Sequence, residues 1–307
     1  MKKRIFGHVL ALSITIIWGV TYIATDLLLG VYSPLQILLF RFLLAYGVLW
    51  IAHPRMQPLA WRTEGRFFLL GFTGGTLCFW AENAALTFTS GTTVSVIVAT
   101  APILTALLAV CTGRIRLGFR GWIGTVVAFS GVLLVIFGGT DGWHAGILGE
   151  LLALLASLSW AVYSIAQEKA TKRFSSLFIV RKIMFYGALT CFPLVICEQL
   201  FTHNPPPLSL VPLSEIKLLV PLLFLGLLGS AVGYIFWAQA QVYLGTLTLS
   251  HYLYAIPFVT MTVSRVALGE PITPYIIIGA LLTTFGVFFA ADKTKSLDPP
   301  SATRWRP

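Results

Sequence analysis

Two ionisable side chains stand inside long apolar stretches, where charge is costly. Glu82 lies in LCFWAENAALTF and Arg41 in LLFRFLLAYG. If these stretches cross a bilayer, each charge costs about 2.5–3.5 kcal/mol on insertion scales. At about 1.5 Å per residue, Glu82 lies roughly 10 Å and Arg41 roughly 12 Å from the same end of adjacent helices, so they are a candidate charge pair. Either the pair locks two helices together, or Glu82 titrates or meets a cation while Arg41 adjusts its proton affinity.

His251, in LSHYLYAIP, is a third titratable candidate. It lies about 9 Å from the other face of the bilayer by the same count. Histidine changes charge near neutral pH and so suits a proton relay. The alternative is structural, because a lone histidine on a helix more often bonds to a neighbouring hydroxyl or carbonyl. The sequence leaves both roles open.

Aromatic residues recur at helical spacing and form the third group of candidates. Residues three or four apart share one face of a helix. Such faces are either aromatic belts at the bilayer surface or the wall of a pocket for a flat or cationic organic molecule. Trp18 and Trp160 fall near the centres of their segments, too deep for a belt. The candidate pocket residues are Trp18, Tyr22, Trp160, Tyr163, Tyr234, Trp237 and Tyr254.

The composition predicts an all-α polytopic membrane protein. The chain is 57% hydrophobic and 10% charged, against about 25% charged in soluble domains. A spanning helix needs roughly 20 apolar residues. Ten segments of that size account for most of the chain and leave no room for a sizeable soluble domain. They are expected at 5–25, 33–52, 67–89, 91–111, 119–139, 146–167, 176–198, 217–241, 245–268 and 273–291.

An internal duplication organises these segments. Pro257 lies 155 residues after Pro102, and Gly124/Gly279 and Gly131/Gly286 keep the same offset. Such a fixed offset indicates a repeat. The expected domains are a first five-helix repeat at 1–141, a second at 142–291, and a disordered cytoplasmic tail at 292–307.

The charge distribution sets the expected orientation. Most of the 21 Lys and Arg residues fall in the N-terminus, the tail and alternate loops, which the positive-inside rule places in the cytoplasm. Both termini are therefore expected inside, and the net charge of +10 is a topology signal with no implication of nucleic acid. Five spans per repeat is an odd number, so the second repeat is expected to be inverted.

Three stretches resemble a known family. SPLQILLFRFLLA (33–45), ALTFTSGTTVSVIVATAPILTALLA (85–109) and ALGEPITPYIIIGALLTTFGVFFA (267–290) are similar to EamA-type members of the drug/metabolite transporter superfamily. The resemblance covers both halves and implies a ten-helix inner-membrane carrier that exports small metabolites, often amino acids or their derivatives. One departure is Gly113-Arg114, which stands where the second repeat has Gly269-Glu270 and which fits the charge rule.

These observations together predict a secondary active exporter that works by alternating access, with protons as a candidate coupling ion. The alternative is a passive facilitator, channel or lipid flippase of the same fold. The sequence shows no HExxH, GxSxG or P-loop motif, so no enzyme is expected. The four cysteines have no zinc or redox spacing, and neither a metal nor a cofactor is expected. The expected partners are a small-molecule substrate and the lipid bilayer, and the expected assembly is a monomer or weak homodimer.

Overall fold

The computed structural model describes residues 2–54, 59–113, 115–116, 118–138, 147–202, 205–206, 208–209, 214–291 and 295–296. The expected repeat boundary at 141/142 lies outside these residues. So does the expected disordered tail at 292–307, apart from a two-residue strand.

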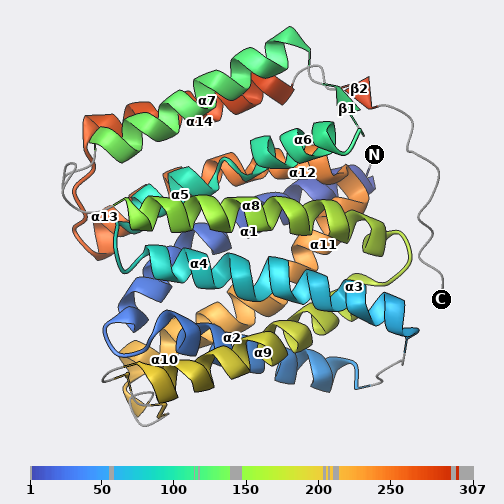
Figure 1. Ribbon diagram of the computed structural model, residues 1–307, viewed down its shortest axis with the longest axis vertical. Helices are drawn as coiled ribbons and strands as arrows, with labels where there is room; N and C mark the ends of the chain where they lie inside the picture. Colours follow the sequence, from blue (N-terminus) through green and yellow to red (C-terminus); the bar gives the residue numbers. More distant parts are fainter. Residues whose placement is uncertain are drawn as a thin grey trace.

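Helices make up nearly all of the described chain (Figure 1). In chain order they are α1 (Lys2–Leu29), α2 (Pro34–Ala52), α3 (Trp61–Gly71), η1 (Phe72–Leu77), α4 (Cys78–Ala85), α5 (Gly91–Val98), α6 (Ala101–Cys111), α7 (Phe119–Gly138), α8 (Leu148–Thr171), α9 (Ser176–Phe201), α10 (Ile216–Leu223), η4 (Phe224–Val232), α11 (Gly233–Leu244), α12 (Thr246–Ser250), η5 (His251–Ala255), α13 (Ile256–Ala267) and α14 (Pro274–Ala291). Two short strands, β1 (Ile115–Arg116) and β2 (Lys295–Ser296), pair antiparallel.

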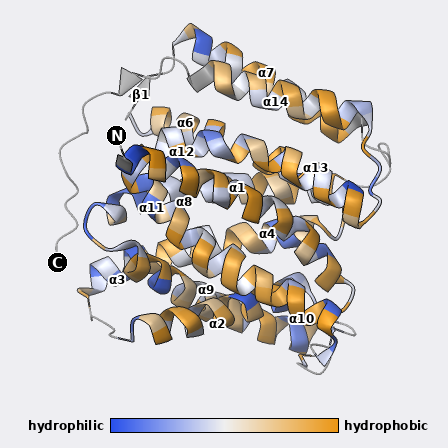
Figure 2. Ribbon diagram, turned by 180° about the vertical axis from the view of Figure 1, so that it is seen from behind, coloured by the Kyte–Doolittle hydropathy of each residue, from blue (hydrophilic) through white to orange (hydrophobic). Residues whose placement is uncertain are grey.

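Seven helices among the described residues are long and apolar enough to cross a membrane. They lie in α1, α2, the α5–α6 stretch, α7, α8, α9 and the α10–η4–α11 stretch. Large apolar side chains on the outside support this reading: Phe119, Val266 and Ile51 are 81%, 84% and 75% exposed. Hydrophobic colours run along most of the helical surface (Figure 2). The protein is therefore a polytopic helical membrane protein, as the composition predicted.

Serine caps start two of these helices. The Ser33 side chain accepts a hydrogen bond from the Gln36 backbone, and the Gln36 side chain accepts one back from the Ser33 backbone, which is a capping box. Ser175 caps α9 in the same way through the Phe178 backbone. Each cap satisfies backbone donors that the first turn leaves unpaired.

The two repeat-marking prolines coincide with breaks in their helices. α5 ends at Val98, and α6 begins at Ala101 with Pro102 in its first turn. Likewise η5 is a 3-10 segment that gives way to α13 just before Pro257. Proline has no N–H and is tolerated in a first turn, so each helix restarts there. Both helices are therefore interrupted at the repeat-marking prolines.

Two π-helical segments interrupt the other long helices. η1 separates α3 from α4, and η4 separates α10 from α11. Each contains closely packed glycines: a Cβ on Gly74 would meet the Tyr163 ring, and one on Gly226 would lie 2.5 Å from Leu44 Cδ2. π-Segments often accompany functional sites, and both of these lie next to the helices that line the cavity described below.

Two helix pairs pack antiparallel. α7 lies along α14 (Figure 1), with Gly131 against Gly279 and Gly124 against Gly286. α2 lies along α9: at one end Ser33 Oγ donates to Glu198 Oε2 at 2.5 Å, and at the other Arg181 donates to the His53 carbonyl. We call the end that carries the start of α1, Ala52 and Trp61 the N-terminal end, at the right of Figure 1.

Candidate functional site

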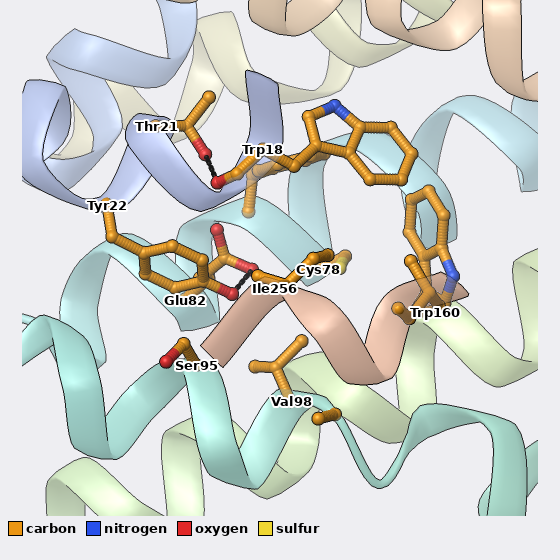
Figure 3. Close-up of a pocket in the computed structure, with 12 residues that line it drawn as sticks. Trp18, Thr21, Tyr22, Cys78, Glu82, Ser95, Val98, Trp160 and Ile256 are labelled. Atoms are coloured by element: carbon orange, nitrogen blue, oxygen red, sulfur yellow. Dashed lines mark hydrogen bonds between the residues drawn. The ribbon is translucent and has the colours of Figure 1, made fainter. Parts of the chain in front are cut away.

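A buried cavity lies in the middle of the helical layers (Figure 3). Its volume is about 40 Å³, measured as the space that the centre of a water molecule can occupy. This is room for a few water molecules. α1, α4, α5, α8, η5 and α13 contribute its wall, together with the break after α5. The lining residues are Trp18, Thr21, Tyr22, Cys78, Phe79, Glu82, Ser95, Val98, Ala99, Trp160, Leu253 and Ile256.

Two indole rings, Trp18 and Trp160, line one side of this cavity, and a third, Trp237, packs against both of them. The Trp18 and Trp160 centroids lie 5.2 Å apart at 86°, an edge-to-face contact, and Trp237 lies 5.4 Å from Trp18 and 5.3 Å from Trp160. All three are buried. Edge-to-face pairs align the positive ring edge with the negative ring face. The cluster therefore has a fixed geometry and gives the cavity an electron-rich aromatic wall.

Hydrogen bonds hold part of the aromatic cluster in place. Trp18 Nε1 donates to the Gly229 carbonyl at 3.0 Å, and the Tyr234 hydroxyl donates to the Gly74 carbonyl. The glycines allow this approach, because a Cβ on Gly233 would lie 2.8 Å from Trp18 Nε1. The π-helical segments thus supply the carbonyls that orient the rings.

The seven aromatic candidates divide into three sets. Trp18, Tyr22 and Trp160 line the cavity. Tyr163, Tyr234 and Trp237 pack behind Trp160, with centroids 4.9, 6.0 and 5.3 Å from it. Tyr254 stands apart, packed with Ile103 and Ala128.

Glu82 is the one carboxylate on the cavity wall. It is 9% exposed, and Tyr22 donates its hydroxyl proton to Glu82 Oε2 at 3.3 Å (Figure 3). No basic side chain of the described residues lies within 4.0 Å of it as an ion pair. A buried carboxylate with a single phenol partner is available to a proton or to a cationic group that enters the cavity.

Arg41 does not form the expected contact pair with Glu82. Its Nε donates to Ser230 Oγ at 2.9 Å, and its guanidinium carbon lies 4.5 Å from the centre of the Phe79 ring. Its Nη2 has no hydrogen-bond partner in the described part of the chain. The depth estimate was compatible with pairing, but the rotation of α2 directs Arg41 to η4, with Phe79 beneath it. Any effect of Arg41 on Glu82 is therefore longer-ranged.

His251 does not line the cavity. It opens η5, and its ring lies 5.9 Å from the Tyr254 ring. A different histidine, His8, accepts or donates a 2.5 Å hydrogen bond with the Tyr252 hydroxyl. Among the described residues no group of three His, Cys, Asp or Glu could hold a metal ion.

With this geometry in view, comparison with known proteins identifies the family. Residues 5–137 and 147–291 match the sequence profile of the EamA-like transporter family. The chain belongs to that family. The resemblance seen in the sequence is thereby confirmed, and the family makes this chain a membrane transporter for a small molecule.

Relatives of this EamA-like transporter carry transporter names. A protein named an uncharacterized transporter from Archaeoglobus fulgidus is 25% identical over 95% of this chain and 100% of its own length. A probable amino-acid metabolite efflux pump from Escherichia coli is 22% identical over 91% and 93%. A probable terminal-alkyne amino-acid exporter from Streptantibioticus cattleyicolor is 26% identical over 82% and 79%. Two of these relatives are thus named for the export of amino-acid compounds.

A solved crystal structure has the same fold. It covers 92% of this chain and 96% of its own chain, with a TM-score of 0.65 at 16% identity. The likeness supports the helical arrangement alone.

Eight of the twelve cavity residues were not among the sequence candidates. Among them, Cys78 and Phe79 stand one turn before Glu82 on α4, and Ser95 lies on α5. The spacing of Cys78 and Phe79 from Glu82 puts all three on one helical face, so that signal was present. Ser95 carried none, because its placement depends on how α5 packs.

Proposed function

We propose that this EamA-like transporter is a secondary active carrier that exports small amphipathic or aromatic metabolites, amino-acid derivatives among them, by alternating access. The observation that carries the proposal is the central cavity, which combines an aromatic wall with one buried carboxylate. Carrier sites near the membrane midplane between two repeats follow this plan.

Two inverted five-helix repeats, with ten spans in all, form the proposed scaffold. The spans lie within α1, α2, α3–η1–α4 from residue 67 onward, α5–α6 and α7, then α8, α9, α10–η4–α11, α12–η5–α13 and α14. Corresponding contacts recur in both halves. A Cβ on Gly131 would lie 2.6 Å from the Gly279 carbonyl oxygen, and one on Gly286 would lie 2.6 Å from the Gly124 carbonyl oxygen. The 155-residue offset relates Gly131 to Gly286 and Gly124 to Gly279. Each contact is therefore the repeat equivalent of the other.

A second correspondence supports the same symmetry. Trp160 lies 142 residues after Trp18, and the same offset relates Leu44 to Tyr186. Gly71 packs on Tyr186, and its equivalent Gly226 packs on Leu44. Because the equivalent helices α2 and α9 run antiparallel, as do α7 and α14, the operation that relates the halves inverts the chain direction.

The cavity lies where the two repeats meet. Trp18 and Trp160 are equivalent, and so are Val98 and Leu253 at the 155-residue offset, and all four line it. In the present conformation the cavity is small, about 40 Å³. We propose that rocking of the repeats, with the proline breaks and π-segments as hinges, opens it to one side at a time.

The proposed substrate class follows from the wall chemistry. Indole and phenol rings attract flat or cationic groups, and Glu82 attracts an amine. The E. coli and Streptantibioticus relatives are named for amino-acid compounds, which supports amino-acid derivatives here. We propose Trp18, Tyr22 and Trp160 as first contacts, with Tyr163, Tyr234 and Trp237 supporting them.

We further propose that a proton and the substrate amine compete for Glu82, which couples export to proton entry. Arg41 and His251 have no direct contact with Glu82 and would act only through the surrounding field or through hydrogen-bonded water. The proposed location is the cell inner membrane, with the basic N-terminal end in the cytoplasm.

Counterflow in proteoliposomes tests the carrier function. Vesicles loaded with an unlabelled aromatic amine such as tryptamine should accumulate the labelled amine transiently, and a protein-free vesicle should not. Rapid equilibration without overshoot would instead indicate a channel, and movement of a labelled lipid between leaflets would indicate a flippase.

A further inference from the structure

Buried polar atoms without partners gather on the facing sides of α8 and α11. Gln167 is fully buried at 0% exposed, and neither Oε1 nor Nε2 has a hydrogen-bond partner in the described chain. Ser164 Oγ and Gln241 Oε1 also lack one there. Burying a polar atom without a partner is unfavourable, so several such atoms in one place call for an explanation.

These side chains form one group. Gln241 Nε2 donates to the Ser164 carbonyl at 3.4 Å and to Thr246 Oγ1 at 3.0 Å, which joins α8 to α11 and α12. Ser164 and Gln167 are three residues apart and share a face of α8. The group therefore combines two amides and one hydroxyl from neighbouring helices.

The group lies beyond the aromatic wall of the cavity, toward the N-terminal end. Gln167 lies two turns beyond Trp160, about 10 Å along the helix, and Gln241 lies one turn beyond Trp237. The indole Nε1 atoms of Trp160 and Trp237 also lack partners among the described residues. A line of unsatisfied polar atoms thus runs from the aromatic wall of the cavity to the amide group.

The chemistry of the group selects its ligand. Gln167 Nε2 is a donor, whereas Gln167 Oε1 and Gln241 Oε1 are acceptors, and none of the three residues is charged. A carboxylate only accepts and would leave both acceptors unpaired. An ammonium group only donates and would leave the Gln167 donor unpaired. A carboxamide or a lactam edge donates and accepts together, so it satisfies both kinds of atom.

We propose that Ser164, Gln167 and Gln241 form a second binding station, which takes the neutral carboxamide or lactam edge of an aromatic substrate between the N-terminal end and the central cavity. The position of this station on a transport path rests on the proposed carrier function. Its ligand preference can be measured without transport.

Gln36 provides a matched control. It is also 0% exposed, but its Oε1 accepts from the Ser33 backbone at 3.2 Å and its Nε2 donates to the Pro206 carbonyl at 2.7 Å. Replacing Gln36 by leucine removes an amide whose hydrogen bonds are satisfied. Replacing Gln167 by leucine removes an amide whose oxygen and nitrogen have no partner among the described residues. Leucine at Gln36 should therefore lower the melting temperature, whereas leucine at Gln167 should leave it unchanged or raise it.

The test is equilibrium binding to the purified full chain in detergent, with indole-3-acetamide, indole-3-acetate and 3-methylindole as probes. Wild type should bind the acetamide about tenfold more tightly than the acetate, since one unpaired buried group costs roughly that factor. Gln167→Leu should lose this preference and still bind 3-methylindole as wild type does. Gln36→Leu should keep the preference. Ser164→Ala, a smaller change, should reduce it a few-fold and serves if Gln167→Leu does not fold.

Three results would overturn the station: no binding of the acetamide, equal wild-type affinity for acetamide and acetate, or a preference that survives both Gln167→Leu and Ser164→Ala. Failure of counterflow with an intact amide preference would reject the carrier function and leave the station standing. Successful counterflow without any amide preference would support the carrier function and reject the station.

Discussion

The Tyr22 hydroxyl donates to Glu82 Oε2 at 3.3 Å, and this contact joins α1 to α4 across the cavity. Tyr22 and Glu82 face the same small space as Trp18 and Trp160. The carboxylate thus has a neutral partner, while Arg41 is engaged with Ser230. The proposed exchange of a proton for a substrate cation at Glu82 follows from this arrangement.

Replacing Glu82 by Gln should abolish pH-driven accumulation. The amide cannot exchange a proton over the physiological pH range, so a pH gradient should produce no protein-dependent accumulation beyond equilibration, while counterflow persists within a few-fold of wild type. Tyr22→Phe, which removes only the hydrogen bond, should keep the pH dependence with a shifted midpoint. An unchanged pH profile in a correctly inserted Glu82→Gln protein would remove Glu82 from the coupling.

Replacing Trp160 by Phe should weaken substrate binding. The smaller ring reduces contact with the Trp18 and Trp237 rings, and we expect KM to rise about 3–10-fold, equivalent to roughly 0.6–1.4 kcal/mol, with kcat little changed. Trp61→Phe is the control, because Trp61 is 79% exposed outside the cavity. Equal KM changes in both variants would show that the effect is general.

The glycine contacts between α7 and α14 predict paired destabilisation. Gly131→Ala and Gly286→Ala each place a Cβ 2.6 Å from a backbone oxygen of the opposite helix, and overpacking of this kind costs about 1–3 kcal/mol. The two losses should be similar if the contacts are equivalent. Gly47→Ala, which meets nothing within 4 Å, should stabilise α2 by about 0.5–1 kcal/mol. Thermal unfolding in detergent measures all three, and a neutral Gly131→Ala would contradict the packing.

A carboxylate at the N-terminal end gives a pH-dependent contribution to stability. Glu64 Oε1 accepts from Lys182 at 2.6 Å and Oε2 accepts from Tyr186 at 2.6 Å. Partial burial opposes ionisation, but the hydrogen bonds from Lys182 and Tyr186 outweigh it and lower the pKa of Glu64. The contribution is therefore fully present above the ordinary glutamate pKa and is lost as pH falls through the lowered pKa.

Glu64→Gln should accordingly lower stability near neutral pH by about 1–2 kcal/mol, with the difference from wild type shrinking in acid. The control is Glu168→Gln, because the Glu168–Lys172 pair is 3.4 Å apart with side chains 41% and 70% exposed and such surface pairs contribute little. A Glu64→Gln deficit that stays constant down to acid pH would argue against this ionic contact.

The sequence was sufficient for the class of fold and for part of the cavity wall. Trp18 and Trp160 were singled out by their depth and recurrence, and Glu82 by its cost in an apolar helix. These features are local, so periodicity and composition reveal them.

Features that depend on helix rotation and on contacts distant in sequence were not predictable. Depth alone could not tell that Arg41 would turn toward Ser230, 189 residues away, or that His251 would lie off the cavity. The π-segments gave no signal beyond their glycines. The partnerless amides of Gln167 and Gln241 are recognisable only once the surrounding atoms are placed.

Side-specific labelling of Val98→Cys and Leu253→Cys tests alternating access most directly. Both positions line the cavity, and each is introduced into a chain whose four native cysteines are replaced. A membrane-impermeant thiol reagent should label each position from either side, and a substrate or proton gradient that increases labelling from one side should decrease it from the other. Simultaneous, gradient-independent labelling from both sides would indicate a channel, and the absence of labelling from either side would contradict a transport cavity.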